Sequence, residues 1–265
     1  MSRIRNHGFA AKITWPGLLV FLVAITACTP SPPQPSGSSA APASSSATTT
    51  PSATASATPP PSATLPPDSD ETAAPRNGDR VISSTVTHDW ASPRAGAPFT
   101  TTHRNPVPLA PPPAEPLPTL YAIGAGQHPS DSPPYDQLSF RFNGAFPSYD
   151  ISFVPELVAD GSGLPVPMPG TGAILKVVFH GAQAHTADGK SSTIKTSPTP
   201  SIGYRALTSY APAGDFEGVL SYGIGVGRPG TTAPPTRVRV YEVEKIEQGR
   251  HLYVVAVQVD ASSWK

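Results

Sequence analysis

Residues 138–142 read Leu-Ser-Phe-Arg-Phe, and this alternating stretch decides the fold class. Apolar and polar side chains follow each other with a period of two, which is typical of a strand with one buried and one solvent-facing side. Residues 149–153, Tyr-Asp-Ile-Ser-Phe, repeat the pattern beyond the turn signal Asn143-Gly144. We therefore predict two half-buried strands that form a hairpin, with a loop that passes through Pro147.

Segments farther along the chain extend the β pattern. Residues 173–179 and 252–259 are apolar at nearly every position, which predicts central strands covered on both faces. Residues 216–226 and 237–243 predict two more strands, and the former is expected to bury Phe216, Leu220, Tyr222, Ile224 and Val226 on one face. No long window has a helical period. About seven strands around one core predict an all-β domain over residues 119–265, an antiparallel sandwich or barrel.

The composition changes upstream of this domain. The chain holds 36 prolines, and from residue 29 to residue 67 nearly every position is Ser, Thr, Pro or Ala. Such a segment cannot bury enough apolar surface to offset its ordering entropy, so we predict a disordered tether over residues 28–118. Residues 106–118 are a second proline-rich tract and predict a stiffer, extended spacer.

Residues 81–102, between the two tracts, are richer in apolar side chains than a linker. They include Val81, Ile82, Val86, Trp90 and Phe99. These residues either add a strand, or a plug formed by Trp90, to the main domain or remain part of the tether. The sequence leaves this question open.

The N-terminus has the features of an export signal. Arg3, Arg5 and Lys12 precede an apolar run over residues 13–24, which is too short for a comfortable membrane span. The run ends at Ile25-Thr26-Ala27-Cys28, which resembles the bacterial lipobox. We therefore predict a lipoprotein signal peptide over residues 1–27, with lipid on Cys28 anchoring the chain at the outer face of the cytoplasmic membrane. The alternative is an ordinary secretory signal with an incidental cysteine. Cys28 is the only cysteine, so no disulfide is expected.

No motif in the sequence predicts catalysis, a metal site or a cofactor. The Gly-Ile-Gly-Val-Gly stretch at residues 223–227 lies inside a period-two strand, so its glycines are interpreted as sites of close packing rather than a nucleotide loop. His180 and His185 lie five residues apart, with His128 and His251 elsewhere, but they form no recognised zinc motif. No Gly-x-Ser-x-Gly elbow occurs. We therefore expect a protein that is not an enzyme.

Charge argues against a nucleic-acid partner. The chain has 18 basic and 18 acidic residues, so no basic face is available to release counterions from phosphates. Arg237 and Arg239 share one side of a strand, either as a solvated face or as a ligand clamp. The long connections 161–172 and 181–202 are candidate binding loops. Tyr149, Tyr204 and Tyr210 are either sugar-stacking contacts or packing residues.

Five segments together carry a family resemblance. They are residues 135–153, 160–166, 174–179, 214–225 and 251–257, and in this order they resemble the AMIN-like domain of lipoproteins from high-GC Gram-positive bacteria. The resemblance covers roughly Leu120 to Ala261. It implies a β-sandwich related to the AMIN domain, a module that accompanies cell-wall amidases and secretins and directs them to peptidoglycan. It supplies no catalytic or ligand-binding residues.

Three hypotheses about function follow. The first is a non-catalytic, membrane-anchored lipoprotein of the cell envelope that binds cell-wall material such as peptidoglycan, or a wall-associated protein. The second is a protein-interaction module that adds a strand or a loop to an envelope complex. The third is an unrecognised enzyme, which needs a cleft with converging titratable groups.

Overall fold

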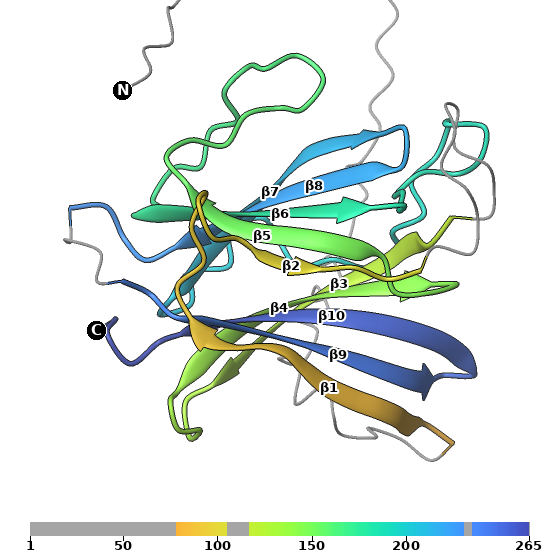
Figure 1. Cartoon of the computed structure of the whole chain (residues 1–265), viewed down its shortest axis with the longest axis horizontal. Helices are drawn as coiled ribbons and strands as arrows, with labels where there is room; N and C mark the ends of the chain where they lie inside the picture. The colour runs from red at the N-terminus through yellow and green to blue at the C-terminus, as the bar shows by residue number, and fades with distance from the viewer. Residues whose placement is uncertain (1–77, 105–116, 231–234, 265) are drawn as a thin grey trace, which may run out of the picture. The chain divides into compact units, whose positions relative to one another are not determined.

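The structure is a computed structural model that describes residues 78–104, 117–230 and 235–264 (Figure 1). The expected signal peptide, Cys28, the tether up to residue 77 and residues 105–116 of the second proline-rich tract lie outside the described residues. Within the described ranges the chain forms ten β-strands and no helix.

The strands form two five-stranded antiparallel sheets, called sheet A and sheet B. Sheet A has the order β1 (Arg80–Ala91), β9 (Val238–Glu247), β10 (Arg250–Asp260), β4 (Tyr135–Asn143) and β3 (Thr119–His128). Sheet B has the order β2 (Phe99–Thr101), β5 (Ser148–Val154), β6 (Ala173–His180), β8 (Val219–Val226) and β7 (Leu207–Phe216). The prediction of an all-β antiparallel sandwich is confirmed.

The main core lies between the two sheets. Phe140 and Phe142 on β4 are fully buried, and each packs edge-on against Phe179 of β6 with ring centroids 5.0 Å apart. Burial of each such side chain stabilises the fold by about 1.5–3 kcal/mol. The alternation at residues 138–142 therefore identified the core side of sheet A correctly.

The predicted hairpin between the first two strands is wrong. β4 belongs to sheet A and β5 to sheet B, so residues 144–147 cross from one sheet to the other (Figure 1). Gly144 has a positive φ of 96°, as the turn signal requires, but four residues separate the strands. Crossing over lets the apolar sides of both strands face the same core from opposite layers.

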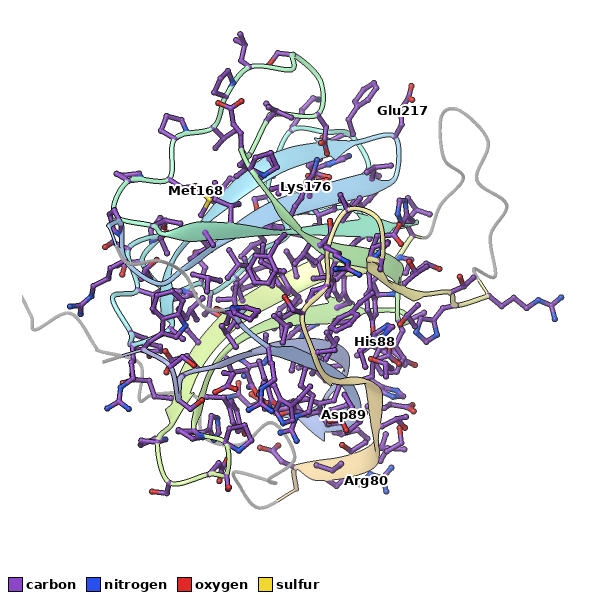
Figure 2. The ribbon with its side chains drawn as sticks, turned by 60° about the vertical axis from the view of Figure 1, so that its left-hand side comes forward. Arg80, His88, Asp89, Met168, Lys176 and Glu217 are labelled. Atoms are coloured by element: carbon purple, nitrogen blue, oxygen red, sulfur yellow. The ribbon has the colours of Figure 1, made fainter. Side chains whose placement is uncertain are left out.

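The two strands predicted to be covered on both faces behave differently. On β10 every residue from Val254 to Asp260 is buried, as expected. On β6, Leu175, Val177 and Phe179 are fully buried, but the alternate residues are only half-buried. The outward side of β6 is partly covered by the connection after β5, which carries Met168 (Figure 2). Asp160 of this connection lies 2.7 Å from Nζ of Lys176 on β6. The full covering predicted for β6 is therefore wrong.

Phe216 also departs from its predicted position. Leu220, Tyr222, Ile224 and Val226 are buried in the core as expected, but Phe216 ends β7 at the β7–β8 turn and is 70% exposed. The turn places Phe216 beyond the end of the core.

Residues 78–104, named the strap here, close one side of the sandwich. β1 pairs with β9 of sheet A, and β2 pairs with β5 of sheet B. His88 stacks on Phe99 at 4.5 Å, and Thr87 shares a 2.8 Å hydrogen bond with the hydroxyl of Tyr149. The segment whose role the sequence left open thus contributes strands to both sheets, and Trp90 is half-buried rather than a core plug.

The opposite side of the sandwich is closed by the connection between β6 and β7. Leu120 and Ile123 of β3 donate backbone hydrogen bonds to Gln183 and Thr196, at 2.8 and 3.0 Å. Farther along, the Tyr210 amide of β7 donates to Pro200. One connection therefore contacts the edges of both sheets, and it carries the candidate site.

Candidate functional site

A cavity of about 470 Å³ lies between residues 184–192 and the strands β7 and β8. Residues 185–192 form a small hairpin in which His185 and Ser192 are bridge partners. Its tip is the Asp188-Gly189 turn, where Gly189 has a positive φ of 67° and the Thr186 hydroxyl donates to Asp188 at 2.6 Å. Asp and Gly favour such a turn, so the local sequence shapes one wall of the cavity.

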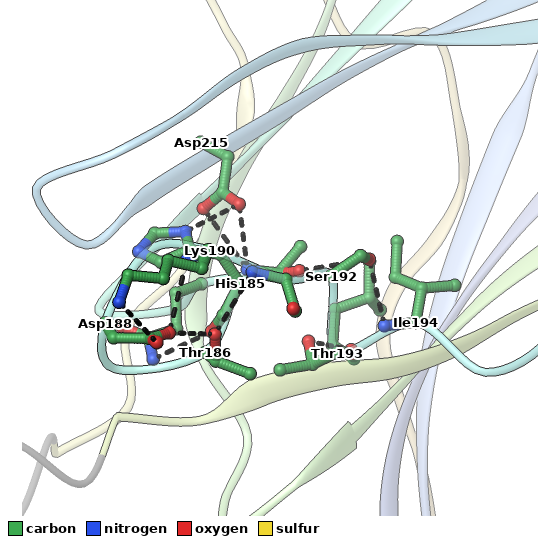
Figure 3. A network of polar contacts seen from close by, with 12 residues as sticks. His185, Thr186, Asp188, Lys190, Ser192, Thr193, Ile194 and Asp215 are labelled. Carbon is green, nitrogen blue, oxygen red and sulfur yellow. Dashed lines mark hydrogen bonds and ion pairs between the residues drawn. The ribbon is translucent and has the colours of Figure 1, made fainter.

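The centre of the site is a histidine–carboxylate pair. Nδ1 of His185 lies 2.8 Å from Oδ2 of Asp215, and the Ala184 amide donates to both oxygens of that carboxylate at 3.2 Å. Figure 3 shows the imidazole and the carboxylate facing each other across the gap between the hairpin and β7. With Nδ1–H donated to Asp215, the Nε2 atom of a neutral His185 is a hydrogen-bond acceptor.

The floor of the cavity is mainly apolar. It includes Pro212, Leu220 and Tyr222. Burial, the charge of Asp215 and the neighbouring Tyr210 all raise the pKa of Tyr222, so its hydroxyl stays protonated. The floor of the cavity therefore offers mainly apolar surface.

The rim of the cavity is polar and exposed. Lys190 and Asp188 form an ion pair of 3.7 Å with side chains 79% and 57% exposed, so the pair is largely screened. The Ser192 hydroxyl donates to the Ala184 carbonyl at 3.3 Å and accepts from the Ile194 amide. Among the described residues the recorded side-chain partner of His185 is Asp215.

The structure separates the histidines that the sequence singled out. His180 lies at the end of β6, outside the cavity, and its Nε2 is 2.8 Å from Asp150. His251 pairs with Glu244 at 2.8 Å, and His128 stacks on Tyr135 at 4.4 Å. In the part of the chain that the structure describes, no group of three or more side chains is placed to hold a metal ion.

The three tyrosines proposed as sugar contacts pack against the protein itself. Tyr149 is fully buried, and Tyr210 is 6% exposed with its hydroxyl donating to the Pro198 carbonyl at 2.7 Å. Tyr204 is half-buried against the main core. The interpretation as packing residues is therefore correct for Tyr149 and Tyr210.

The glycines at residues 223–227 are sites of close packing, as expected. A Cβ on Gly223 would lie 2.4 Å from Cδ2 of Leu157, and one on Gly225 would lie 2.3 Å from the Thr171 hydroxyl. At Gly227 the ring of Trp264 occupies the same space, at 2.1 Å. Side chains here would collide with the segments that cover β8.

The side chains of Arg237 and Arg239 contact residues of sheet A. Arg237 donates from Nε and Nη2 to Asp260, at 2.8 and 2.6 Å. Arg239 donates to Gln258 at 2.6 Å and lies over the Trp90 ring, 4.8 Å from its centroid. These contacts hold both guanidinium groups and leave no open clamp of the kind considered from the sequence.

Asp215 is the site residue that sequence reasoning missed. It lies 30 residues from His185, and no local pattern links the two positions. The sequence did indicate His185 and the long connection 181–202.

Within the described ranges, no helix is long and apolar enough to span a membrane. The AMIN-like domain model matches residues 118–255, just over half of the chain, from the start of β3 into β10. The match leaves out the strap. No curated protein and no solved structure matches. The chain belongs to the AMIN-like domain family.

Proposed function

We propose that this protein is an exported lipoprotein of the cell envelope whose AMIN-like domain binds cell-wall material. The observation that carries the proposal is the family match over residues 118–255. The motif Ile25-Thr26-Ala27-Cys28 supports lipid attachment at Cys28, which would hold the protein at the outer face of the cytoplasmic membrane. The protein acts by binding, without a catalytic step.

The cavity beside the 185–192 hairpin is the proposed ligand site. It is a solvent-open hollow with a volume of about 470 Å³. Nε2 of a neutral His185 and the carboxylate oxygens of Asp215 can accept hydrogen bonds, while Leu220 and Pro212 provide apolar contact. A sugar ring needs this combination, since it presents hydroxyls at its edge and C–H groups on its faces.

Co-sedimentation with purified peptidoglycan tests this proposal. The protein should pellet with the polymer at low and at high salt, because the site offers no large electrostatic attraction. His185→Ala and Asp215→Asn should each weaken binding by about tenfold, the effect of losing about 1.4 kcal/mol of hydrogen bonding.

His180→Ala is the matched control, since His180 has the same pairing with a carboxylate but lies outside the cavity. This variant should bind like the unchanged protein. Equal losses in the His180 and His185 variants would place the binding site elsewhere.

A protein partner is the second candidate. Phe216 and Leu164 are 70% and 65% exposed, which favours contact with another protein. Absence of co-sedimentation at about 50 μM protein would make this function the better hypothesis. Phe216→Ser and Leu164→Ser should then reduce capture of the partner without changing the fold.

A further inference from the structure

Sheet A has one edge strand whose outer side is unpaired within the described ranges. β1 is the first strand of the sheet and pairs with β9 on one side only. At the other edge of the sheet, β3 is already occupied, because its backbone is hydrogen-bonded to the connection between β6 and β7. The unpaired N–H and C=O groups of an edge strand are a template for a further strand. β1 is therefore the edge at which sheet A can be extended (Figure 1).

The middle of β1 is exposed and uncharged. Residues 82–86 read Ile-Ser-Ser-Thr-Val, and all five are exposed. Ile82 and Val86 are 45% and 53% exposed, and they are two of the four large apolar side chains exposed in the described part of the chain. β-branched side chains are favoured where they pack against the side chains of a neighbouring strand. This stretch is therefore better suited to contact with another strand than to contact with water.

The stretch is complementary to itself. The register between β1 and β9 shifts at Ile82 and at Thr87, so Ser83–Val86 is the regular run of the strand. Ile82 and Val86 lie two residues before and two residues after Ser84. A twofold axis at Ser84, perpendicular to the sheet, places Ile82 of each copy opposite Val86 of the other copy. Such an axis produces a closed contact between identical surfaces.

The charges near the ends of β1 favour the antiparallel orientation. Arg80 at the start and Asp89 near the end are both exposed, and among the described residues neither forms an ion pair (Figure 2). When a second β1 runs antiparallel about Ser84, Arg80 of each copy lies near Asp89 of the other. A parallel alignment would place like charges side by side. The nearby Asp79 is held by its own sheet, since its Oδ1 accepts a 2.7 Å hydrogen bond from the Gln248 amide.

We propose that β1 is a self-association surface, through which two copies of this chain pair antiparallel about Ser84 and join their A sheets into one continuous sheet. The register shifts confine the regular ladder to a few residues, so the contact is small and the association is reversible. Because the β3 edge is occupied, pairing at β1 closes a dimer and does not continue into a fibre. The inference is independent of the proposed function, since β1 lies outside the cavity and outside the family match.

Sedimentation velocity of the full chain, with Cys28→Ser to prevent lipid attachment, tests the proposal. The mean sedimentation coefficient should rise between about 10 and about 500 μM protein, the range expected for a small contact. Val86→Lys places a charge in the centre of the contact and should raise the dissociation constant at least about tenfold. Leu164→Lys is the matched control, since it changes an exposed apolar side chain elsewhere and should leave the association unchanged. Circular dichroism checks that each variant keeps its β structure.

Charge reversal tests the orientation of the two strands. Arg80→Glu and Asp89→Arg should each weaken the association, because like charges then meet at both ends of the contact. The double variant should restore it.

A cross-link tests the position of the twofold axis. Ser84→Cys in the Cys28→Ser chain should form a disulfide between copies, because facing Cα atoms of antiparallel strands lie about 4.5–5.5 Å apart. Ser162→Cys, at an exposed position outside β1, should not.

Three results would overturn the proposal: a chain that stays monomeric over this concentration range, a Val86→Lys variant that associates as strongly as the unchanged chain, or a double charge variant that fails to restore association. All variants share the same N-terminal residues. Association through those residues would persist in Val86→Lys and would also overturn the proposal. Should Val86→Lys lose its fold, the charge variants at the exposed Arg80 and Asp89 decide.

Discussion

The covering of sheet B depends on the absence of a side chain at Gly223. At Gly223 the absence of a Cβ lets the connection after β5 lie flat on β8, with Leu157 fully buried. On the other side of the molecule, Asp260 gathers hydrogen bonds from Arg237 and from Ser262 at the end of β10. Both residues support predictions about stability.

Gly223→Ala should destabilise the fold by about 1–3 kcal/mol, the usual cost of overpacking a core. The new Cβ would lie 2.4 Å from Cδ2 of Leu157, and a fully buried leucine has little room to move. Urea denaturation measures the effect. Gly161→Ala is the control, since nothing lies within 4 Å of a Cβ at that position. Equal changes in the two variants would show that the contact with Leu157 does not constrain the fold.

Asp260 should make stability fall at acidic pH. Burial raises the pKa of Asp260, but hydrogen bonds from Ser262 and Arg237, with the charge of Arg237, outweigh burial and hold the pKa below its usual range. Because the folded-state pKa is depressed, the stabilisation is present above the unfolded value of about 3.9 and is lost as pH falls through the folded value. Asp260→Asn should therefore lower the urea midpoint at about pH 7 and shrink the difference between about pH 7 and pH 3. Glu156→Gln, at an exposed position, should change neither.

The strap is the element that most affects the rest of the domain. It supplies the outer neighbour of β9 in sheet A and of β5 in sheet B, and its His103 lies 2.7 Å from Glu242, whose side chain is 8% exposed. Removal of the strap would open both strand edges and leave the buried Glu242 carboxylate without this partner. The family match begins after the strap, at residue 118.

A chain that begins at residue 78 should therefore unfold cooperatively and at a higher temperature than one that begins at residue 118. The β pattern of the sequence predicted a domain that begins at residue 119. The contacts of β1 and β2 now predict that this shorter chain is less stable and prone to self-association through its open edges. Thermal unfolding followed by near-ultraviolet circular dichroism compares the two. Identical midpoints would show that the strap is dispensable.

At the scale of the whole molecule, the predicted lipid on Cys28 decides where the domain acts. Cys28→Ala should release the protein from the membrane fraction or leave its signal peptide uncleaved, because the thiol that receives the lipid is absent. Cell fractionation followed by mass spectrometry of the N-terminus measures both outcomes. Cys28→Ser, which also lacks a thiol, should behave in the same way. An unmodified mature chain that starts at another residue would contradict the prediction.

Much of the fold could be predicted because side-chain alternation is a local property. The pattern at residues 138–142 identified a strand and its buried side, and residues 223–227 indicated close packing, without knowledge of any neighbour. An antiparallel β architecture follows from several such segments separated by turns. Local patterns also indicated the 181–202 connection as a place for a site.

Only the tertiary structure decided which segments meet. The turn after β4 was readable, but the placement of β5 in the other sheet depends on which core its apolar side completes. The pairing of β1 with β9 joins residues about 160 positions apart, and His185 meets Asp215 across 30 residues. Such contacts depend on how the two sheets pack. A sequence pattern that covers a few neighbouring residues does not specify which distant segment those residues contact.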